Sequence, residues 1–131
     1  MNDFDLILSA QTARLRAYAP YSRFAVGAAL LCPDGRVFSG CNVENISFGL
    51  TLCAERSALV AAVAAGYQTF EAIAIVADTD VPISPCGACR QVLAEFQPNL
   101  RILTATLKGS IETLHLHDLL PRAKTGILNT P

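Results

Sequence analysis

The amino-acid sequence predicts an α/β fold, a three-layer α-β-α sandwich in which helices cover a mixed sheet of roughly five strands. Short apolar runs rich in Val and Ile alternate with longer segments rich in Ala, Leu and Glu, which favours strands alternating with helices. A turn signal between the first two apolar runs adds a hairpin, so at least one strand pair must be antiparallel. A chain of 131 residues is typical of one domain, so residues 1–131 are expected to fold as a single unit.

The first half of the chain is expected to hold a helix, a hairpin and a loop. Apolar residues in the first segment favour a helix that ends before Pro20, because proline cannot continue a helix. Pro33-Asp34-Gly35 is typical of a tight turn, and the stretch after the hairpin has no clear period. The predicted elements are a helix over 4–17, strands over 26–31 and 36–41, and a loop over 42–52.

The second half of the chain alternates helices and strands. An Ala-rich segment favours a helix, and the glycine after it is the residue that most often follows a helix end. Two runs rich in β-branched residues favour strands. The predicted elements are a helix over 53–65 with Gly66 as its C-cap, a strand over 71–77, a helix over 87–96, a strand over 101–107 and a short helix over 116–120.

The composition indicates an apolar surface beyond what a monomer needs. Hydrophobic residues make up 52% of the chain and charged residues only 16%. An average soluble domain carries about 25% charged residues, and a small domain has proportionally more surface to keep polar. Apolar contacts between subunits would account for this deficit, so the composition predicts a homo-oligomer.

Charge and hydropathy disfavour two classes of partner. The formal net charge is -1 and the 10 basic residues are scattered, whereas nucleic-acid binding depends on clustered phosphate contacts. No apolar run is long enough to span a bilayer, and the acidic start of the chain does not resemble a signal peptide. The sequence therefore predicts a cytoplasmic protein without nucleic-acid or membrane partners, in which cysteines are more often metal ligands or core residues than disulfides.

Three cysteines stand at the predicted starts of two helices. Cys86 and Cys89 are three positions apart, on one side of a helical turn, where two thiolates can bind one tetrahedral ion. The free N–H groups of a helix start favour the thiolate form. Alone, this pair also fits a redox dithiol or half of a structural zinc site. Cys53 adds a third sulfur, and three protein ligands leave one position for water, which is typical of catalytic zinc.

Glu55 and two arginines complete the candidate metal site. Glu55 lies two positions after Cys53, so both side chains can face one ion only if the ion lies beyond the helix end. Glu55 is then placed to take a proton from water and to deliver it to a substrate nitrogen. Because three thiolates on Zn²⁺ leave a net negative charge, we expect guanidinium groups of Arg56, Arg90 or both to donate hydrogen bonds to the sulfurs.

These residues resemble one known family, the small homotetrameric zinc-dependent cytidine deaminases. The resemblance rests on Cys-Ala-Glu-Arg at 53–56 and Pro-Cys-Gly-Ala-Cys-Arg-Gln at 85–91, in a likeness that runs from about 21 to about 96. It includes Tyr-Ser-Arg-Phe-Ala-Val-Gly at 21–27 and Gly-Cys-Asn-Val-Glu-Asn at 40–45. Related polynucleotide deaminases usually have His in place of the first Cys and lack the Asn-x-Glu-Asn element, so both differences favour a free nucleoside as substrate.

The resemblance implies a cytidine deaminase-like fold, one Zn²⁺ per subunit, and deamination of cytidine and deoxycytidine in pyrimidine salvage. It implies that Asn42 and Glu44 bind the ribose hydroxyls, that Phe24 packs against the pyrimidine, and that Ala54 lies in the substrate site. Glu55 would carry a proton from water to N3 of the base, and would then pass a proton to the departing amino group. The resemblance also implies a homotetramer in which neighbouring subunits complete each active site.

The sequence departs from the family pattern at two places that bear on the substrate. Phe48 stands where the family commonly has Tyr, and no aromatic residue follows the Leu-Leu-Pro at 119–121. A contact to the base would then come from elsewhere, for example from Ile127 or Leu128. Three alternatives stay open at this point: a deaminase of a related aminopyrimidine nucleoside such as blasticidin S, a non-catalytic zinc-binding module, and a redox C-x-x-C protein.

The remaining cysteines and histidines are assigned no part in the chemistry. Cys32 directly follows one predicted strand and Cys41 ends the next, and in such positions a free cysteine is often a small buried apolar residue. His115 and His117 have the spacing of a metal pair but no partner nearby in the sequence, so surface or structural roles are predicted. The Ala-rich run over 58–65 predicts close packing of its helix, a candidate subunit contact.

Overall fold

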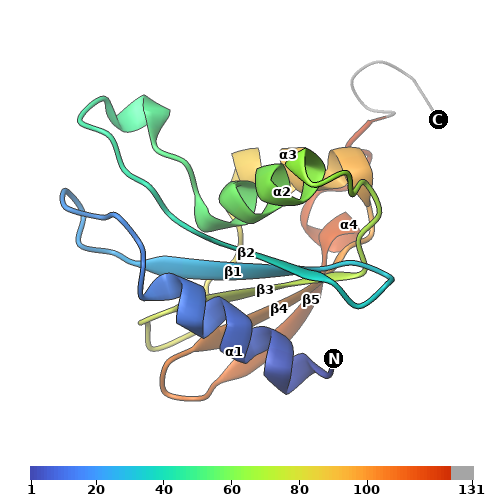
Figure 1. Ribbon diagram of the computed structural model, residues 1–131, viewed down its shortest axis with the longest axis horizontal. Helices are drawn as coiled ribbons and strands as arrows, with labels where there is room; N and C mark the ends of the chain where they lie inside the picture. The colour runs from blue at the N-terminus through green and yellow to red at the C-terminus, as the bar shows by residue number, and fades with distance from the viewer. Residues whose placement is uncertain (125–131) are drawn as a thin grey trace.

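The computed structural model describes residues 1–124, and these residues build a mixed sheet between two layers of helices (Figure 1). The sheet has 5 strands in the order β2-β1-β3-β4-β5. Only β3 and β4 are parallel, and the other neighbouring pairs are antiparallel. The predicted three-layer α/β sandwich is confirmed. The strands are β1 (Val26–Leu31), β2 (Val37–Cys41), β3 (Ala72–Ala77), β4 (Arg101–Thr106) and β5 (Ile111–His115).

Helices cover the sheet on both faces. Figure 1 shows α1 on one side and α2 and α3 on the other. Each face has its own apolar core, and the central strands β1 and β3 contribute alternate residues to both cores. These two strands are therefore apolar at nearly every position, as expected for strands buried on both faces. The helices are α1 (Asp3–Arg14), α2 (Ala54–Ala64), α3 (Gly87–Phe96) and α4 (Leu116–Leu119), with a 3-10 turn at Phe48–Leu50.

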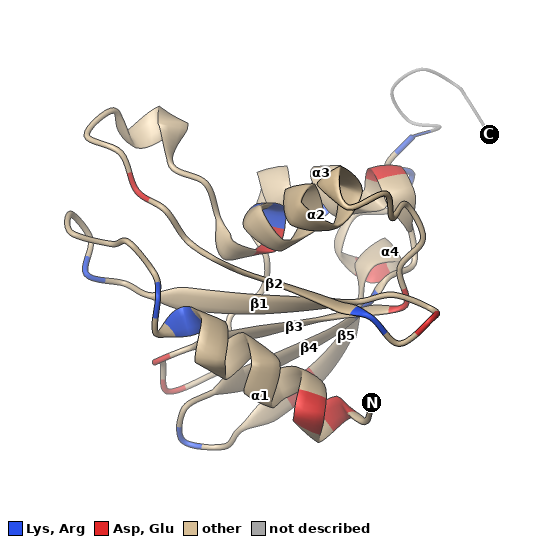
Figure 2. Cartoon of the chain, viewed as in Figure 1, with Lys and Arg blue, Asp and Glu red and all other residues tan. Residues whose placement is uncertain are grey.

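The first helix is shorter than the sequence predicts. Its start is well defined, because the Asn2 side chain accepts a hydrogen bond from the Asp5 N–H and acidic residues occupy the first turn, as Figure 2 shows. It ends at Arg14 and not at Ala17. Leu15 is 79% exposed, so continuing the helix would bury no further apolar surface against the sheet. No helix among residues 1–124 has the length and apolar character needed to cross a membrane.

The fifth strand lies in a segment for which the sequence predicts no element. Strand β5 pairs antiparallel with β4 through a turn in which Gly109 has φ +100, a value that favours glycine. Its residues are mostly exposed, so the segment lacks the apolar run by which a strand is recognised. The segment therefore forms a strand because its backbone pairs with β4, and not because of its own apolar pattern. The other predicted elements are present with ends shifted by at most one residue. The C-cap of α2 is Ala65 and not the predicted Gly66, which follows it with φ +96.

Two glycines allow helices to approach the sheet closely. A Cβ atom on Gly40 of β2 would lie only 2.4 Å from the backbone N of Ala58 in α2. A Cβ atom on Gly27 of β1 would lie 1.9 Å from the backbone O of Ala10 in α1, on the opposite face. Ala58 and Ala62 are fully buried, in agreement with the close packing predicted for this Ala-rich helix. The contact with Gly40 therefore fixes the height of α2 above the sheet, close to the residues at its start.

Candidate metal centre and active site

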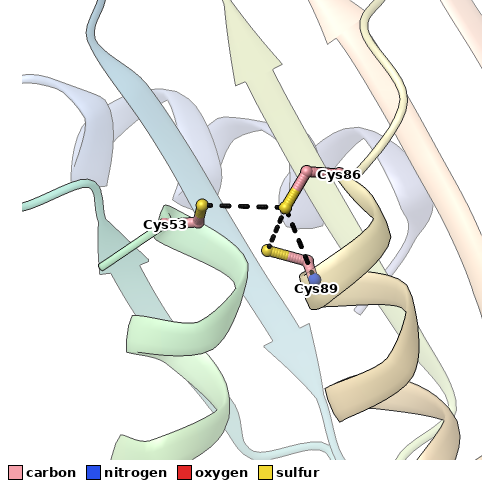
Figure 3. A group of neighbouring side chains, drawn as sticks. All are labelled: Cys53, Cys86 and Cys89. Carbon is pink, nitrogen blue, oxygen red and sulfur yellow. Dashed lines mark hydrogen bonds between the residues drawn. The ribbon is translucent and has the colours of Figure 1, made fainter. Parts of the chain in front are cut away.

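The three predicted metal ligands come together where two helices begin. Cys53 is the N-cap of α2, and Cys86 is the N-cap of α3. Cys89 lies in the first turn of α3, and its backbone N–H donates to Cys86 Sγ over 3.4 Å. Figure 3 shows the three sulfurs pointing toward one another between the ends of the two helices. The positive end of each helix dipole lies at these helix starts, which stabilises negative charge there, and in α3 the Cys89 N–H also donates to a sulfur directly.

The sulfur geometry fits a single zinc ion. Three sulfurs held about 2.3 Å from one ion at tetrahedral angles lie about 3.8 Å apart. Here Cys86 Sγ is 3.9 Å from Cys53 Sγ and 3.4 Å from Cys89 Sγ, and all three sulfurs lie within 4.8 Å of one another. Among residues 1–124 no other Cys, His, Asp or Glu joins this group. The described residues thus supply three ligands, and a fourth position remains for water or substrate.

Glu55 occupies the buried side of this centre. It lies in the first turn of α2 and is only 5% exposed. Burial raises the pKa of its carboxyl group, although its own backbone N–H, the Cys89 thiol and Arg56 act in the opposite direction. A carboxyl group that exchanges protons in a desolvated position next to the ligands is chemically suited to general acid–base work.

The two arginines proposed from sequence lie in different environments. Arg56 Nη2 donates a hydrogen bond to Cys53 Sγ over 3.2 Å, and this contact is the largest of those that raise the pKa of the guanidinium. The Arg90 guanidinium donates to oxygen atoms and not to a sulfur: to Pro85 O over 2.8 Å, to Leu119 O over 3.2 Å and to Ser84 Oγ over 3.1 Å. Arg56 is thus the arginine that hydrogen-bonds a ligand sulfur, and the donor groups of Arg90 contact oxygen atoms instead.

The Asn42 side chain forms hydrogen bonds with the backbone of Phe24 and of Val26. Its Oδ1 accepts from the Val26 N–H over 2.9 Å, and its Nδ2 donates to Phe24 O over 2.7 Å. The Asn42 side chain is nearly buried, whereas Phe24 is 40% exposed. The carboxamide still has one N–H and one lone pair for a ligand, because an amide offers two donors and two acceptor sites.

Glu44 is held by a loop that includes a residue not singled out by the sequence. Its Oε1 accepts from the N–H groups of Tyr21 (2.9 Å) and Ser22 (3.1 Å), and its Oε2 accepts from the Ser22 hydroxyl. Ser22 Oγ in turn accepts from the Phe24 N–H over 3.0 Å. Arg23 between them has φ 59, an unusual value for a residue with a side chain. Ser22 belongs to the motif at 21–27 and Glu44 to the motif at 40–45, but neither motif predicts that the two side chains meet.

A cleft of about 400 Å³ lies at this loop and is lined by Tyr21, Ser22, Glu44, Phe48 and Thr51. Phe48 is 70% exposed, and its ring meets that of Tyr21 edge to face at a centroid distance of 5.8 Å. A larger hollow of about 570 Å³ lies between α1, β2 and α2, and none of the cysteine ligands lines it. The size of a hollow therefore does not mark the candidate metal centre, which is defined by the position of the three cysteines.

The other two cysteines and both histidines lie outside the three-cysteine cluster. Cys32 is buried in the core and Cys41 is half-buried at the end of β2. His115 and His117 lie on the surface around α4, where His117 Nδ1 is 3.2 Å from Asn99 Oδ1. These placements agree with the surface or structural roles predicted for them. Ile127 and Leu128, named as possible base contacts, lie outside the described residues.

The α/β sandwich and the three-sulfur centre together define a class, that of zinc enzymes with an open ligand position and an acid beside it. Residues 2–105 match the family model described as the cytidine and deoxycytidylate deaminase zinc-binding region. The chain therefore belongs to the cytidine and deoxycytidylate deaminase family, and the predictions of family, zinc cofactor and hydrolytic deaminase class are confirmed.

Relatives and solved structures agree with this assignment. The chain is 51% identical over 119 residues to the cytidine deaminase of Sporosarcina psychrophila, covering 90% of this chain and 88% of that protein. It is 53% identical over 122 residues to the cytidine deaminase of Halalkalibacterium halodurans, covering 92% of each. The crystal structure of cytidine deaminase from Burkholderia pseudomallei superposes with a TM-score of 0.90 at 53% identity, covering 92% of this chain and 98% of that one.

Proposed function

We propose that this protein hydrolyses cytidine and deoxycytidine to uridine and deoxyuridine with release of ammonia. The observation that carries the proposal is the cluster of three cysteine sulfurs within 4.8 Å of one another beside a buried glutamate. Relatives that are named cytidine deaminase share about half of their residues with this chain over most of its length. Because the same cysteines and glutamate were found from motifs alone, sequence and geometry support one site.

The described residues divide the chemistry among them. Cys53, Cys86 and Cys89 would hold the ion, which when bound supplies Lewis-acid activation of water. Glu55 takes a proton from the attacking water and delivers it to N3 of the pyrimidine, while the water oxygen adds to C4. Glu55 then takes the remaining proton from the hydroxyl at C4 and passes it to the amino group, so that the C4–N bond breaks, the C4 carbonyl forms and ammonia leaves. Arg56, through its hydrogen bond to Cys53 Sγ, offsets part of the negative charge of the three thiolates.

Four residues are proposed to hold the nucleoside. Phe24 packs its exposed ring against the base, and Ala54, which is fully buried at the first position of α2, would meet the base only if substrate binding uncovers it. Asn42 and Glu44 bind the ribose hydroxyls. Both side chains already carry hydrogen bonds to the 21–26 segment, so ribose binding would use the donor and acceptor positions that remain. Their pre-existing bonds support the proposal, because a ligand then meets groups that are already oriented.

We further propose a cytoplasmic homotetramer of pyrimidine salvage in which neighbouring subunits complete each site. The loop that precedes α2 projects from the body of the protein in Figure 1, and Ile46, Phe48 and Leu50 on it are at least 70% exposed. Such clustered apolar side chains are typical of a subunit contact. Lys and Arg are dispersed over separate elements in Figure 2, which favours a small substrate over a polynucleotide.

The proposal is tested by measuring cytidine turnover and metal content on the same purified sample. We expect about one zinc per chain and release of ammonia from cytidine and deoxycytidine. Glu55→Gln keeps the shape of the side chain but cannot carry the proton, so it should lose turnover while zinc stays bound. Wild-type turnover in that variant would remove Glu55 from its role. Preferential turnover of blasticidin S in the same assay would favour the alternative substrate.

A further inference from the structure

The segment immediately before Cys86 is held in place by one arginine. Arg90 Nε donates to Pro85 O over 2.8 Å, and Nη2 donates to Ser84 Oγ over 3.1 Å. Nη1 donates to Leu119 O over 3.2 Å, at the end of α4. One guanidinium therefore connects the start of α3, the loop that leads into it and the end of a second helix. The carbonyl of Leu119 belongs to the last turn of α4, where carbonyl groups have no partner within the helix.

A second side chain holds the same segment from the sheet. Thr104 of β4 is 1% exposed, and its hydroxyl donates to the carbonyl of Ile83. The hydrogen bonds of Thr104 and Arg90 thus reach three consecutive residues, 83–85, and Cys86 follows directly. Because proline has a fixed φ, a held carbonyl at Pro85 leaves Cys86 little freedom to move.

We propose that Arg90 is a positioning residue that places the zinc ligand Cys86 through the shape of its guanidinium and not through its charge. The planar guanidinium presents several donors in fixed directions, and three of them meet three oxygen atoms here. A lysine ammonium carries the same charge but cannot reproduce this fork. Arg56 provides the contrast, because its guanidinium donates to a ligand sulfur itself.

The inference rests on the zinc site of the proposed function, but not on which nucleoside the protein accepts. The test measures the rate at which purified zinc-loaded protein releases zinc to a chromogenic chelator. The variants are Arg90→Ala, Arg90→Lys, Thr104→Val and Thr104→Ser, with folding checked by thermal melting. Arg101→Lys is the matched control, because that arginine pairs with Asp3 and not with the Cys86 segment. The absorption spectrum of each Co²⁺-substituted protein reports the thiolate geometry independently of activity.

Both Arg90 variants should release zinc about 10- to 100-fold faster than wild type, the range typical of lost support around a metal ligand. Thr104→Val should act in the same direction, and Thr104→Ser, which keeps the hydroxyl, should behave like wild type. The thiolate-to-cobalt bands should change in the fast-releasing variants only. Wild-type release by Arg90→Lys would overturn the inference, because charge alone would then suffice, and so would wild-type release by Arg90→Ala. If Arg90→Ala does not fold, the zinc-release rates of Arg90→Lys, Thr104→Val and Thr104→Ser still test the inference.

A wild-type protein that binds no zinc would give a different result from any of these. It would refute the metal site and the proposed function together. Equal release rates in zinc-loaded wild type and variants would refute only the role assigned to Arg90.

Discussion

Replacing Gly40 with alanine tests whether the height of α2 above the sheet sets the geometry of the metal site. The new Cβ would lie 2.4 Å from Ala58 N and 2.8 Å from Ala54 O, whereas ordinary contact begins at 3.4 Å. Relief of the closest contact requires a shift of about 1 Å, and the opposing atoms are backbone, so the helix itself must move. Overpacking of this kind costs about 1–3 kcal/mol. For a chain of 131 residues this lowers Tm by roughly 4–11 °C, using about 2.1 cal/mol/K of unfolding entropy per residue.

The same shift should disturb the chemistry, because α2 starts at the metal centre. Cys53 is its N-cap and Glu55 lies in its first turn, while Cys86 and Cys89 belong to a different helix. A displacement of about 1 Å in a reacting group can lower the rate about 100-fold. Gly40→Ala should therefore reduce kcat for cytidine by about that factor and accelerate zinc release.

The assay pairs Gly40→Ala with Gly27→Ala. Gly27 faces α1, and its Cβ would lie 1.9 Å from Ala10 O, so this variant overpacks the opposite face of the same sheet. Both variants should lose stability in thermal melting, but only Gly40→Ala should release zinc faster. Equal zinc release from the two variants, or wild-type kcat and zinc release in Gly40→Ala despite a lowered Tm, would refute the reasoning.

Three further predictions concern charge and metal. The Ser22 hydrogen bonds hold the pKa of Glu44 below its ordinary value, so the stabilisation from this carboxylate is present above the ordinary pKa and is lost as the pH falls through the lowered one. Ser22→Ala should raise the pKa of Glu44 in an NMR titration; an unchanged value contradicts the contact. The pKa of Asp34 is lowered mainly by the hydrogen bond from the Arg36 N–H and secondly by the one from the Tyr67 hydroxyl. Tyr67→Phe should therefore raise this pKa only in part, and a full return to the ordinary value in the same titration would contradict the assignment. Chelation should lower Tm in a melting experiment, and Zn²⁺ but not Mg²⁺ should restore it, because thiolates select zinc; recovery with Mg²⁺ would exclude a thiolate site.

The sequence by itself determined most of the fold and predicted the cysteines of the candidate metal centre. The strand before Cys86, the Ala-rich helix after Cys53 and the spacing of Cys86 and Cys89 are local patterns, each set by burial or by helical periodicity. Because helix starts carry the cysteines, predicting the helices also predicted where the sulfurs would point. The three sulfurs lie within 4.8 Å of one another, as one shared metal ion requires.

Tertiary structure alone decided which partners the polar side chains find. Strand β5 is ordered by pairing with β4, since its own residues are too exposed to mark it as a strand. Arg56 and Arg90 each follow a predicted cysteine ligand by three positions or fewer in the sequence, but one donates to sulfur and the other to the loop and to α4. The physical reason is that a hydrogen bond needs an acceptor at a definite distance and direction. Such acceptors come from elements far away in the chain, and only packing brings them within reach.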